Sequence, residues 1–556
     1  MNFSQKPNVL DVLILSIFTI LITLYPYYLH GQINIFEVGL YLPGIQSVLN
    51  GEIPFRDFFH LRGPFELYMP AALMKIFGIH LKYLSFYFYF GTVLCLILSV
   101  FIAKELLNTR LMLYVFVPVF VARTFPRVVF TYWGGMRYAF GLLAMWLAIK
   151  FFKKERSGWL LAAGLTTAAA LFTSIEMGIY AMMGILFACC FSYIFKIHDR
   201  TLLLRSVAFY MLGVTIIAGP YVLYLAANQA FGPYIESVRA VVSNMQNVFN
   251  PHLVSEYPSN FKEALMAMAN PVHTNFKHMT PSYLYIAILI YLIIRFKNKT
   301  FSKTDVFILC LSIYGFIMYN TGFRGIWAAQ FEMALQPEKI ILFFLFELML
   351  FQILPQWRLL QNKKWLMSVI CGLFVIGSIG YSIQRYNHRF FAFKFLCHIA
   401  QGKDPELLKP GHDGKSRPLT IERASGMIVP LEQAQELEEV EVFVKKNVPP
   451  VEVIFTYPEL GAYNFLVNRR YLGRFPMATF AWFNDHWHAE LMNDLEQSKV
   501  KYIILQKQMP DYWKAVYLGV ESNRKMYKDV MDFIAAHYTV AQETKSSYIY
   551  KLKDSL

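Results

Sequence analysis

The chain has 556 residues, of which 56% are hydrophobic, 17% are aromatic and only 16% are charged. A soluble protein carries about a quarter charged residues, so this composition excludes a soluble protein. Lysine and arginine together number 52 against 37 aspartates and glutamates, which gives a formal net charge of +15. Such a charge could attract nucleic acid, but its distribution along the chain indicates a membrane topology instead.

About eleven apolar segments approach the roughly 20 residues that a helix needs to cross a bilayer. They predict an all-α polytopic membrane domain over residues 1–385. The predicted spans cover residues 9–29, 84–103, 111–130, 137–152, 158–175, 177–195, 203–226, 281–296, 304–321, 338–355 and 365–384.

Basic residues concentrate in every second short connection between these spans. Because cytoplasmic loops are enriched in lysine and arginine, these connections are expected in the cytoplasm. The N-terminus is then cytoplasmic, and an odd number of spans places the C-terminus outside, so no nucleic acid partner is required. The basic connections contain Lys104 and Arg110; Lys153, Lys154 and Arg156; Lys196, Arg200 and Arg205; Arg295, Lys297, Lys299 and Lys303; and Arg358, Lys363 and Lys364.

Two further parts follow the membrane domain. Residues 386–420 contain the stretch QGKDPELLKPGHDGKSRP, whose Gly, Pro and charge content is typical of a linker. Residues 421–556 alternate helical and strand patterns, which predicts a small α/β domain on the outer side. The helical pattern lies at 431–447, buried strands are expected at 451–457 and 499–506, and a last edge strand is expected at 546–552.

The first external loop, residues 30–83, contains two short apolar segments and several charges. Val38, Leu42, Ile45 and Leu49 recur at helical spacing, and a second apolar segment follows Pro64. Both segments are too short to span a bilayer, so they are expected to lie along the membrane surface. They flank the charged stretch EIPFRDFFHLRG, which indicates a reaction on a lipid headgroup, whereas an ordinary solvated loop is the alternative.

An acid just after the first span, a surface helix, the run GEIPFRDFF and a Gly-Pro before an apolar helix resemble the GT-C superfamily. Its members are membrane glycosyltransferases that take a sugar from a polyprenyl-phosphate donor. The sequence is most similar to the branch of the protein O-mannosyltransferases and the lipid A aminoarabinose transferase. The resemblance extends to the architecture of many spans, a first external loop with two surface helices and an outer α/β domain.

The resemblance implies roles for three residues of this loop. Glu37 takes the position of the acid that serves as general base or aligns the acceptor. Asp57 is the second loop acid and could orient the acceptor or a divalent metal. Arg62 stands where related transferases have a lysine on the lipid phosphate. The match is incomplete, because Phe36 precedes Glu37 where the family often has a second acid.

Three residues outside this loop extend the predicted site. Arg137 lies where the family has a further acid at the start of the fourth span, and together with Arg324 on a late external loop it is expected to face the donor phosphate. Glu176 lies on a very short external turn, a costly depth for a charge without a role, and is expected to be an additional acid. The structural alternatives are helix capping by Glu176, headgroup snorkelling by Arg62 and ordinary surface positions for Glu37 and Asp57.

These residue types suit the chemistry. Displacing a polyprenyl phosphate from an anomeric carbon needs a base for the acceptor proton and cations for the departing phosphate. Carboxylates serve the first task, and arginine binds phosphate bidentately. Attack from the opposite face inverts the anomeric carbon. The expected partners are the bilayer, a polyprenyl-phosphate-linked sugar and a glycan, lipid or protein acceptor, in a bacterial inner membrane.

Two other functions stay open at this point. A transporter or flippase of lipid-linked glycans would use the same charges as translocation contacts, although the absence of an internal repeat disfavours it. A non-catalytic GT-C-like protein is consistent with the missing acids. No metal centre is predicted: His486 and His488 lie near Asp485 and Glu490, but no further ligand pattern converges on them.

Overall fold

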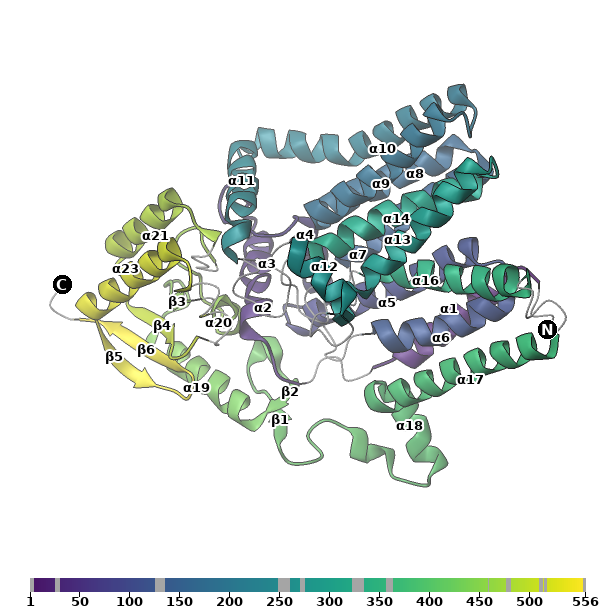
Figure 1. Cartoon of the computed structure of the whole chain (residues 1–556). Coiled ribbons are helices and arrows are strands. Elements are labelled where there is room, and N and C mark those ends of the chain that lie inside the picture. The colour runs from purple at the N-terminus through teal and green to yellow at the C-terminus, as the bar shows by residue number, and fades with distance from the viewer. Residues whose placement is uncertain are drawn as a thin grey trace. The chain divides into compact units, whose positions relative to one another are not determined.

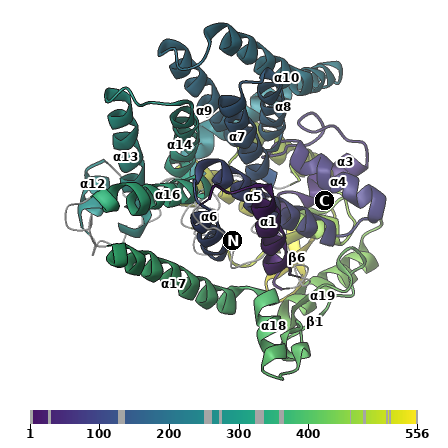
Figure 2. The same ribbon diagram turned by 90° about the vertical axis from the view of Figure 1, so that its right-hand side faces the viewer.

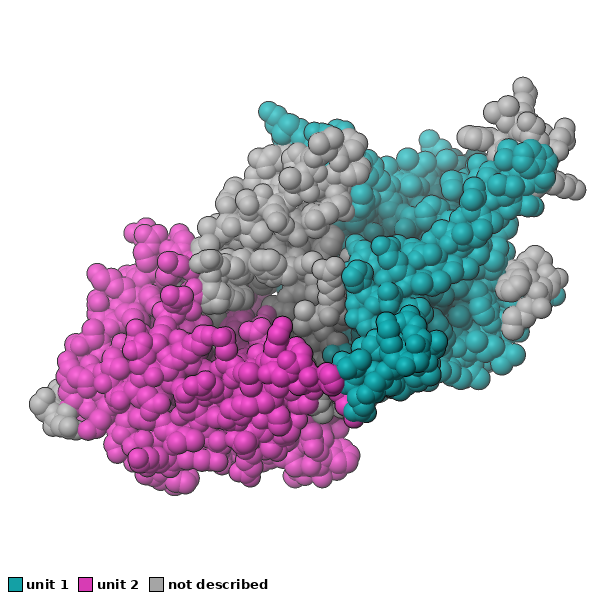
Figure 3. Space-filling model, turned by 90° about the horizontal axis from the view of Figure 1, so that it is seen from below, with its two compact units in different colours: residues 1–26, 88–220, 256–408 teal, residues 27–87, 221–255, 409–556 magenta. Residues whose placement is uncertain are grey.

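A computed structural model of the chain (Figure 1) describes residues 5–25, 31–125, 136–248, 261–270, 276–322, 335–356, 364–458, 460–476, 482–509, 514 and 518–553. The chain folds into two compact units, and each unit is built from segments that are not continuous in sequence (Figure 3). Unit 1 comprises residues 1–26, 88–220 and 256–408, and unit 2 comprises residues 27–87, 221–255 and 409–556.

Unit 1 consists of helices, and a helix occurs at each of the predicted spans. Five helices of the described residues are long and apolar enough to cross a membrane, which agrees with an integral membrane protein. The helices are α1 (Val9–Thr23), α5 (Lys82–Leu106), α6 (Arg110–Thr124), α7 (Met136–Lys154), α8 (Ser157–Thr173), α9 (Ile175–Ile194), α10 (Arg200–Ala227), α12 (Phe261–Ala269), α13 (Phe276–Lys297), α14 (Lys303–Gly322), α16 (Gln336–Leu348), α17 (Lys364–Arg389) and α18 (Phe391–Ala400).

Helix α17 shows most clearly the apolar surface that these helices expose. It lies at the edge of the unit 1 helices in Figures 1 and 2, where it packs on α6 and α18. Leu373 and Ile376 on this helix are 65% and 68% exposed. Continuous apolar exposure along a helix of this length is stable only in a bilayer. The segment 386–420, expected as a linker, begins with the end of α17 and with α18.

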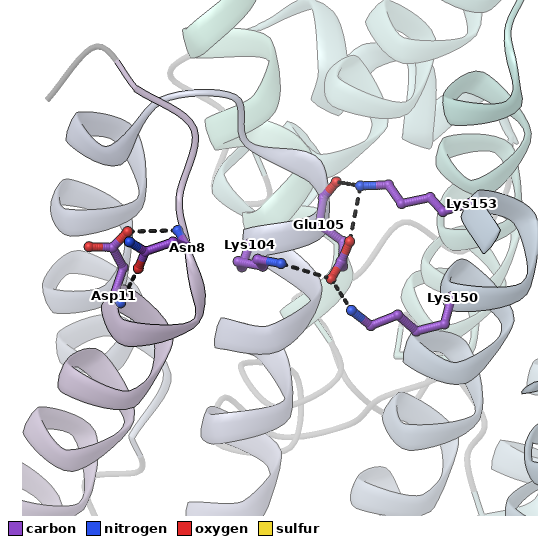
Figure 4. A network of polar contacts seen from close by, with 6 residues as sticks. All are labelled: Asn8, Asp11, Lys104, Glu105, Lys150 and Lys153. Carbon is purple, nitrogen blue, oxygen red and sulfur yellow. Dashed lines mark hydrogen bonds and ion pairs between the residues drawn. The ribbon is translucent and has the colours of Figure 1, made fainter. Parts of the chain in front are cut away.

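Several predicted cytoplasmic lysines converge on one acid at the end of α5. Glu105 is ion-paired with Lys104 at 3.4 Å, with Lys153 at 3.0 Å and with Lys150 (Figure 4). Since Lys150 and Lys153 belong to α7, the carboxylate ties the ends of two helices together. The basic residues that indicate the cytoplasmic side therefore also hold the helix ends.

A second acid at this end of the unit closes the first turn of α1. The side chains and backbone N–H groups of Asn8 and Asp11 hydrogen-bond reciprocally at 2.7 and 3.0 Å, which forms a capping box (Figure 4). Arg110 Nε at the start of α6 donates to Asp11 Oδ2 at 2.8 Å. Both helix starts are thus fixed by one buried carboxylate.

Unit 2 combines the first external loop with the C-terminal α/β part. Its four-stranded sheet has the order β3-β4-β6-β5, with β3 parallel to β4 and the remaining pairs antiparallel. Its elements are α2 (Ile35–Gly39), α3 (Leu42–Leu49), α4 (Phe65–Phe77), α11 (Phe231–Val248), β1 (Ser416–Pro418), β2 (Ile428–Pro430), α19 (Leu431–Asn447), β3 (Phe455–Tyr457), α20 (Gly461–Leu466), α21 (Asp485–Ser498), β4 (Tyr502–Gln506), α23 (Glu521–His537), β5 (Tyr538–Glu543) and β6 (Ser547–Leu552).

The predicted helix and strands of this domain occur as α19, β3, β4 and β6, but one placement was wrong. The last strand, β6, is not an edge strand, because it lies between β4 and β5. Strand β5 was missed because its burial pattern lacks a clean alternation: only Tyr538 is fully buried, and Val540 is 52% exposed. A half-exposed edge strand gives a weak sequence signal.

The apolar face of the first loop helices is covered by protein. Val38, Leu42 and Ile45 are 2%, 0% and 0% exposed, and α2 and α3 pack on α20 while α3 also packs on α4 (Figure 1). The expectation that this face rests on the membrane surface is therefore wrong. Its helical spacing reports burial inside unit 2, because an internal partner and a membrane produce the same apolar pattern.

Candidate active site

Glu37 lies in the first turn of α2 and is only 8% exposed. The Asn34 side chain accepts the backbone N–H of Glu37 at 3.2 Å and caps the helix. Unsatisfied N–H groups in a first turn favour a carboxylate there. The helix thus positions one buried acid at the start of the first external loop.

Asp57 is held by its own loop. Both carboxylate oxygens accept from Arg56, at 2.7 Å from Nε and 2.8 Å from Nη2, and Oδ2 also accepts the Ile53 N–H at 2.7 Å. Hydrogen bonding from Arg56 lowers the pKa of Asp57, and the Ile53 N–H contributes in the same direction. These contacts favour a role for Asp57 in holding the loop over contact with a substrate.

The loop around Asp57 stores backbone strain. Phe55 has φ of 73°, in the left-handed region that bulky residues avoid, yet its side chain is 2% exposed. Its ring packs on Tyr234 with centroids 4.9 Å apart, and its N–H donates to Phe58 O at 2.7 Å. Such strain persists only where the surroundings over-determine it, which is common at functional sites.

Five polar residues, Tyr41, His60, Arg62, Glu66 and Tyr87, form what we call the loop cluster. The rings of Tyr41 and His60 lie with centroids 6.4 Å apart, and His60 is within electrostatic range of Arg62. Tyr87 is within electrostatic range of Glu66 and of Tyr41. Arg62 is half-buried, whereas the other four side chains are at most 4% exposed. The fold therefore brings cationic, acidic and neutral polar groups of the first loop and the start of α5 together.

Only Arg62 of this cluster was singled out from the sequence, and the other four members were not. Glu66 is 1% exposed in the first turn of α4, directly after the Gly63–Pro64 start of that helix. An acid just inside an apolar helix is the signal that could have indicated it. Burial, followed by the neighbouring Arg62, lowers the pKa of His60 to about 3, so this imidazole is neutral at physiological pH.

The first loop is fastened to the C-terminal part of unit 2. Phe59 N–H donates to Arg474 O at 2.7 Å, and its ring lies 4.9 Å from that of Trp487. The hydroxyls of Ser47 and Tyr471 are hydrogen-bonded at 2.8 Å. The loop cluster is therefore held by a folded domain, which fixes its side chains more rigidly than a solvated loop would.

In unit 1, two predicted site residues are partners of each other. Arg137 Nη2 at the start of α7 is 2.6 Å from Glu176 Oε2 at the start of α9, with side chains 8% and 30% exposed. Arg137 Nε also donates to Ser174 at 3.2 Å. The charge of each therefore compensates the other, and the position of Glu176 at the start of α9 also fits the capping alternative. Arg324 lies outside the described residues.

The acids and histidines near Trp487 have other partners than a metal. His488 Nε2 lies 3.1 Å from Asp529, and Glu490 is paired with Arg474 at 2.6 Å. No group of three or more potential metal-ligating His, Cys, Asp or Glu residues occurs among the residues that the structure describes. The oxygens of Asp57 are occupied by Arg56 and Ile53, so the described residues do not fit a metal centre.

Solved structures of membrane glycosyltransferases resemble the chain along almost its whole length. ArnT from Cupriavidus metallidurans bound to undecaprenyl phosphate gives a TM-score of 0.53 at 10% identity, over 98% of this chain and 98% of its own. The apo state of that protein gives 0.51 at 10% identity, over 98% and 97%. The Archaeoglobus fulgidus oligosaccharyltransferase, in complex with zinc and sulfate, gives 0.50 at 10% identity, over 97% and 72%. No protein-family model and no curated protein matches the chain.

At this identity the likeness shows the fold alone. Both neighbours are GT-C glycosyltransferases, and ArnT is the lipid A aminoarabinose transferase of the branch that the first loop resembles. The likeness includes both the membrane helices and the C-terminal α/β part, because it covers 97–98% of the chain. The chain therefore has the GT-C fold, as its first external loop and its architecture indicate.

Proposed function

We propose that the chain is a GT-C membrane glycosyltransferase that moves a sugar from a polyprenyl-phosphate donor to an acceptor on the outer face of the membrane. The observation that carries the proposal is the buried Glu37 and the half-buried Arg62 of the first loop, held on a folded domain. The GT-C fold supports it, and one protein of this fold was solved with undecaprenyl phosphate.

In the proposed reaction, Glu37 takes the proton from the acceptor nucleophile as the nucleophile attacks the anomeric carbon. The bond from that carbon to the phosphate oxygen breaks, the electron pair leaves with the polyprenyl phosphate, and the anomeric centre inverts. Arg62 binds the departing phosphate through its planar guanidinium. Arg324 remains a proposed second phosphate contact, whereas Arg137 and Glu176 are proposed to position one another.

The test replaces Glu37 by glutamine, which keeps size and polarity but cannot accept a proton. Purified protein in lipid nanodiscs would be incubated with a panel of undecaprenyl-phosphate sugars and candidate acceptors, and release of undecaprenyl phosphate would be measured. We expect Glu37→Gln to lower single-turnover transfer by about 10²–10⁴-fold with an unchanged thermal midpoint.

Glu52→Gln is the matched control, because Glu52 is an acid of the same loop outside the proposed machinery. Glu52 is half-buried and hydrogen-bonded to Tyr471, so glutamine, which keeps its size and polarity, should leave transfer within about twofold of wild type. Normal transfer by folded Glu37→Gln would remove Glu37 as the base. A wild-type protein that turns over no lipid-linked sugar would count against the enzyme itself and favour a transporter or a non-catalytic role.

A further inference from the structure

His60 has an unusual environment for an imidazole. It is 4% exposed, and its Nε2 atom has no hydrogen-bond partner within the part of the chain that the structure describes. A buried polar atom left without a partner destabilises the folded state, and most such atoms in native proteins are satisfied. An atom of this kind in the middle of a polar cluster is a place where a ligand can supply the missing partner.

The neighbours of His60 indicate the chemistry of that ligand. Arg62, two residues further along, provides a positive charge in electrostatic range of the imidazole. The Tyr41 ring lies edge-to-face with the His60 ring, with centroids 6.4 Å apart and an interplanar angle of 63°. A phosphate oxygen is the group that pairs with a guanidinium and can also accept a neutral N–H.

We propose that His60 is a positioning residue for the phosphate of the lipid-linked donor, binding one phosphate oxygen through Nε2–H beside the guanidinium of Arg62. This inference rests on the proposed function and deepens it. Arg62 supplies the charge, and His60 adds a directional hydrogen bond without adding charge. Burial and Arg62 keep the imidazole neutral, so His60 is neither the general acid nor the general base.

The first experiment measures the affinity of nanodisc-reconstituted wild type for undecaprenyl phosphate, with undecaprenol and inorganic phosphate as separate probes. Tight binding of undecaprenyl phosphate alone is expected, because both the lipid and the phosphate contribute. Equal binding of inorganic phosphate would overturn the assignment to a lipid headgroup. Absence of all binding by wild type would count against the proposed function, before any variant is considered.

The second experiment compares His60→Leu and His60→Gln. Leucine removes the orphan polar atom, so the thermal midpoint without ligand should stay equal or rise, while the Kd for undecaprenyl phosphate rises about tenfold. Glutamine retains an N–H donor and should recover most of the affinity. In turnover, both variants should change KM for the donor more than kcat.

A purely structural histidine predicts a different outcome. His60→Leu would then bind undecaprenyl phosphate as tightly as wild type, and that result would end the proposal while leaving the proposed function intact. His488→Leu is the matched control, since His488 pairs with Asp529 away from the loop cluster. It should leave the Kd within about twofold, because His488 has its own partner and takes no part in the proposed phosphate contact.

A third measurement does not depend on the folding of a variant. In wild-type protein labelled with ¹⁵N-histidine, the Nε2 resonance of His60 should shift when undecaprenyl phosphate binds and should not shift with undecaprenol. If the Nε2 resonance of His60 did not shift at saturating undecaprenyl phosphate, that result would directly contradict the proposed contact between His60 and the phosphate.

Discussion

At the scale of single residues, charges that look independent in the sequence prove to be paired. Arg137 and Glu176 are 39 positions apart, and each was expected to meet the donor or the acceptor, yet they meet each other at 2.6 Å. Asp57 is held by its neighbour Arg56. Pair formation between separate helices follows from tertiary packing, which spacing along the chain does not reveal.

We predict that the Arg137–Glu176 pair stabilises unit 1 and that breaking it from either side is costly. Glu176→Gln leaves the mostly buried Arg137 without its countercharge, and Arg137→Met leaves Glu176 without its own. Each substitution should lower the free energy of unfolding by about 1–3 kcal/mol, measured as the thermal midpoint in detergent. The double variant should lose less than the sum, because the second change removes an already unpaired charge.

The same variants separate a positioning role from a catalytic one. If the two residues position one another, the double variant should retain measurable transfer under conditions where it is folded. A fully folded double variant that has lost all transfer would instead assign Glu176 or Arg137 to the reaction itself.

At the scale of elements, the sequence predicted the positions of the helices well, but it did not predict which other elements they pack against. The membrane helices are recognisable from long apolar runs, because a bilayer requires apolar side chains along the whole spanning segment. Val38, Leu42 and Ile45 were recognised as one helical face, but the sequence could not distinguish a lipid surface from α20 as its cover. Glu37 and Arg62 were singled out because the loop is rich in charge and because the resemblance to the GT-C superfamily implies roles for them, whereas the burial of His60 and Glu66 depends on residues as distant as Tyr87.

The contact between α20 and the first loop is close enough to be sensitive to a single methyl group. A Cβ added to Gly461 would lie 2.6 Å from Pro476 O and 3.2 Å from Pro43 Cγ. We predict that Gly461→Ala lowers the free energy of unfolding by about 1–3 kcal/mol, as overpacking does elsewhere. Because the shift displaces the loop that carries Glu37, transfer should fall together with the thermal midpoint.

Gly372→Ala inside α17 is the matched control, because nothing lies within 4 Å of its added Cβ. This second substitution should be neutral or slightly stabilising, since alanine is the better helix former. Equal stability and transfer in the two variants would show that α20 does not constrain the loop.

At the scale of the whole molecule, the distribution of charge predicts the side of the membrane on which each part lies. Lys104 and Lys153, which pair with Glu105, and Arg110, which pairs with Asp11, belong to the connections that the positive-inside rule assigns to the cytoplasm, whereas Lys150 lies within α7. The ion pairs do not neutralise the excess of positive charge at this end of the helices, because three lysines surround the single carboxylate of Glu105. The proposed reaction on the outer face depends on this orientation, since Glu37 and Arg62 lie on the side opposite to these lysines in the predicted topology.

The orientation can be tested in cells with two reporters fused after Leu556. We predict that a reporter active only outside the cytoplasm is active there and that a reporter active only inside it is silent, because the basic connections hold the N-terminus in the cytoplasm. The same cytoplasmic reporter inserted between α7 and α8, after Glu155 in the basic connection of Lys154 and Arg156, should be active and serves as the control for expression. The reverse pattern at Leu556, with a normal control, would place the first external loop and the C-terminal part in the cytoplasm. Glu37, His60 and Arg62 would then meet a lipid-linked donor only in the inner leaflet, and the proposed transfer would have to take place on the cytoplasmic side.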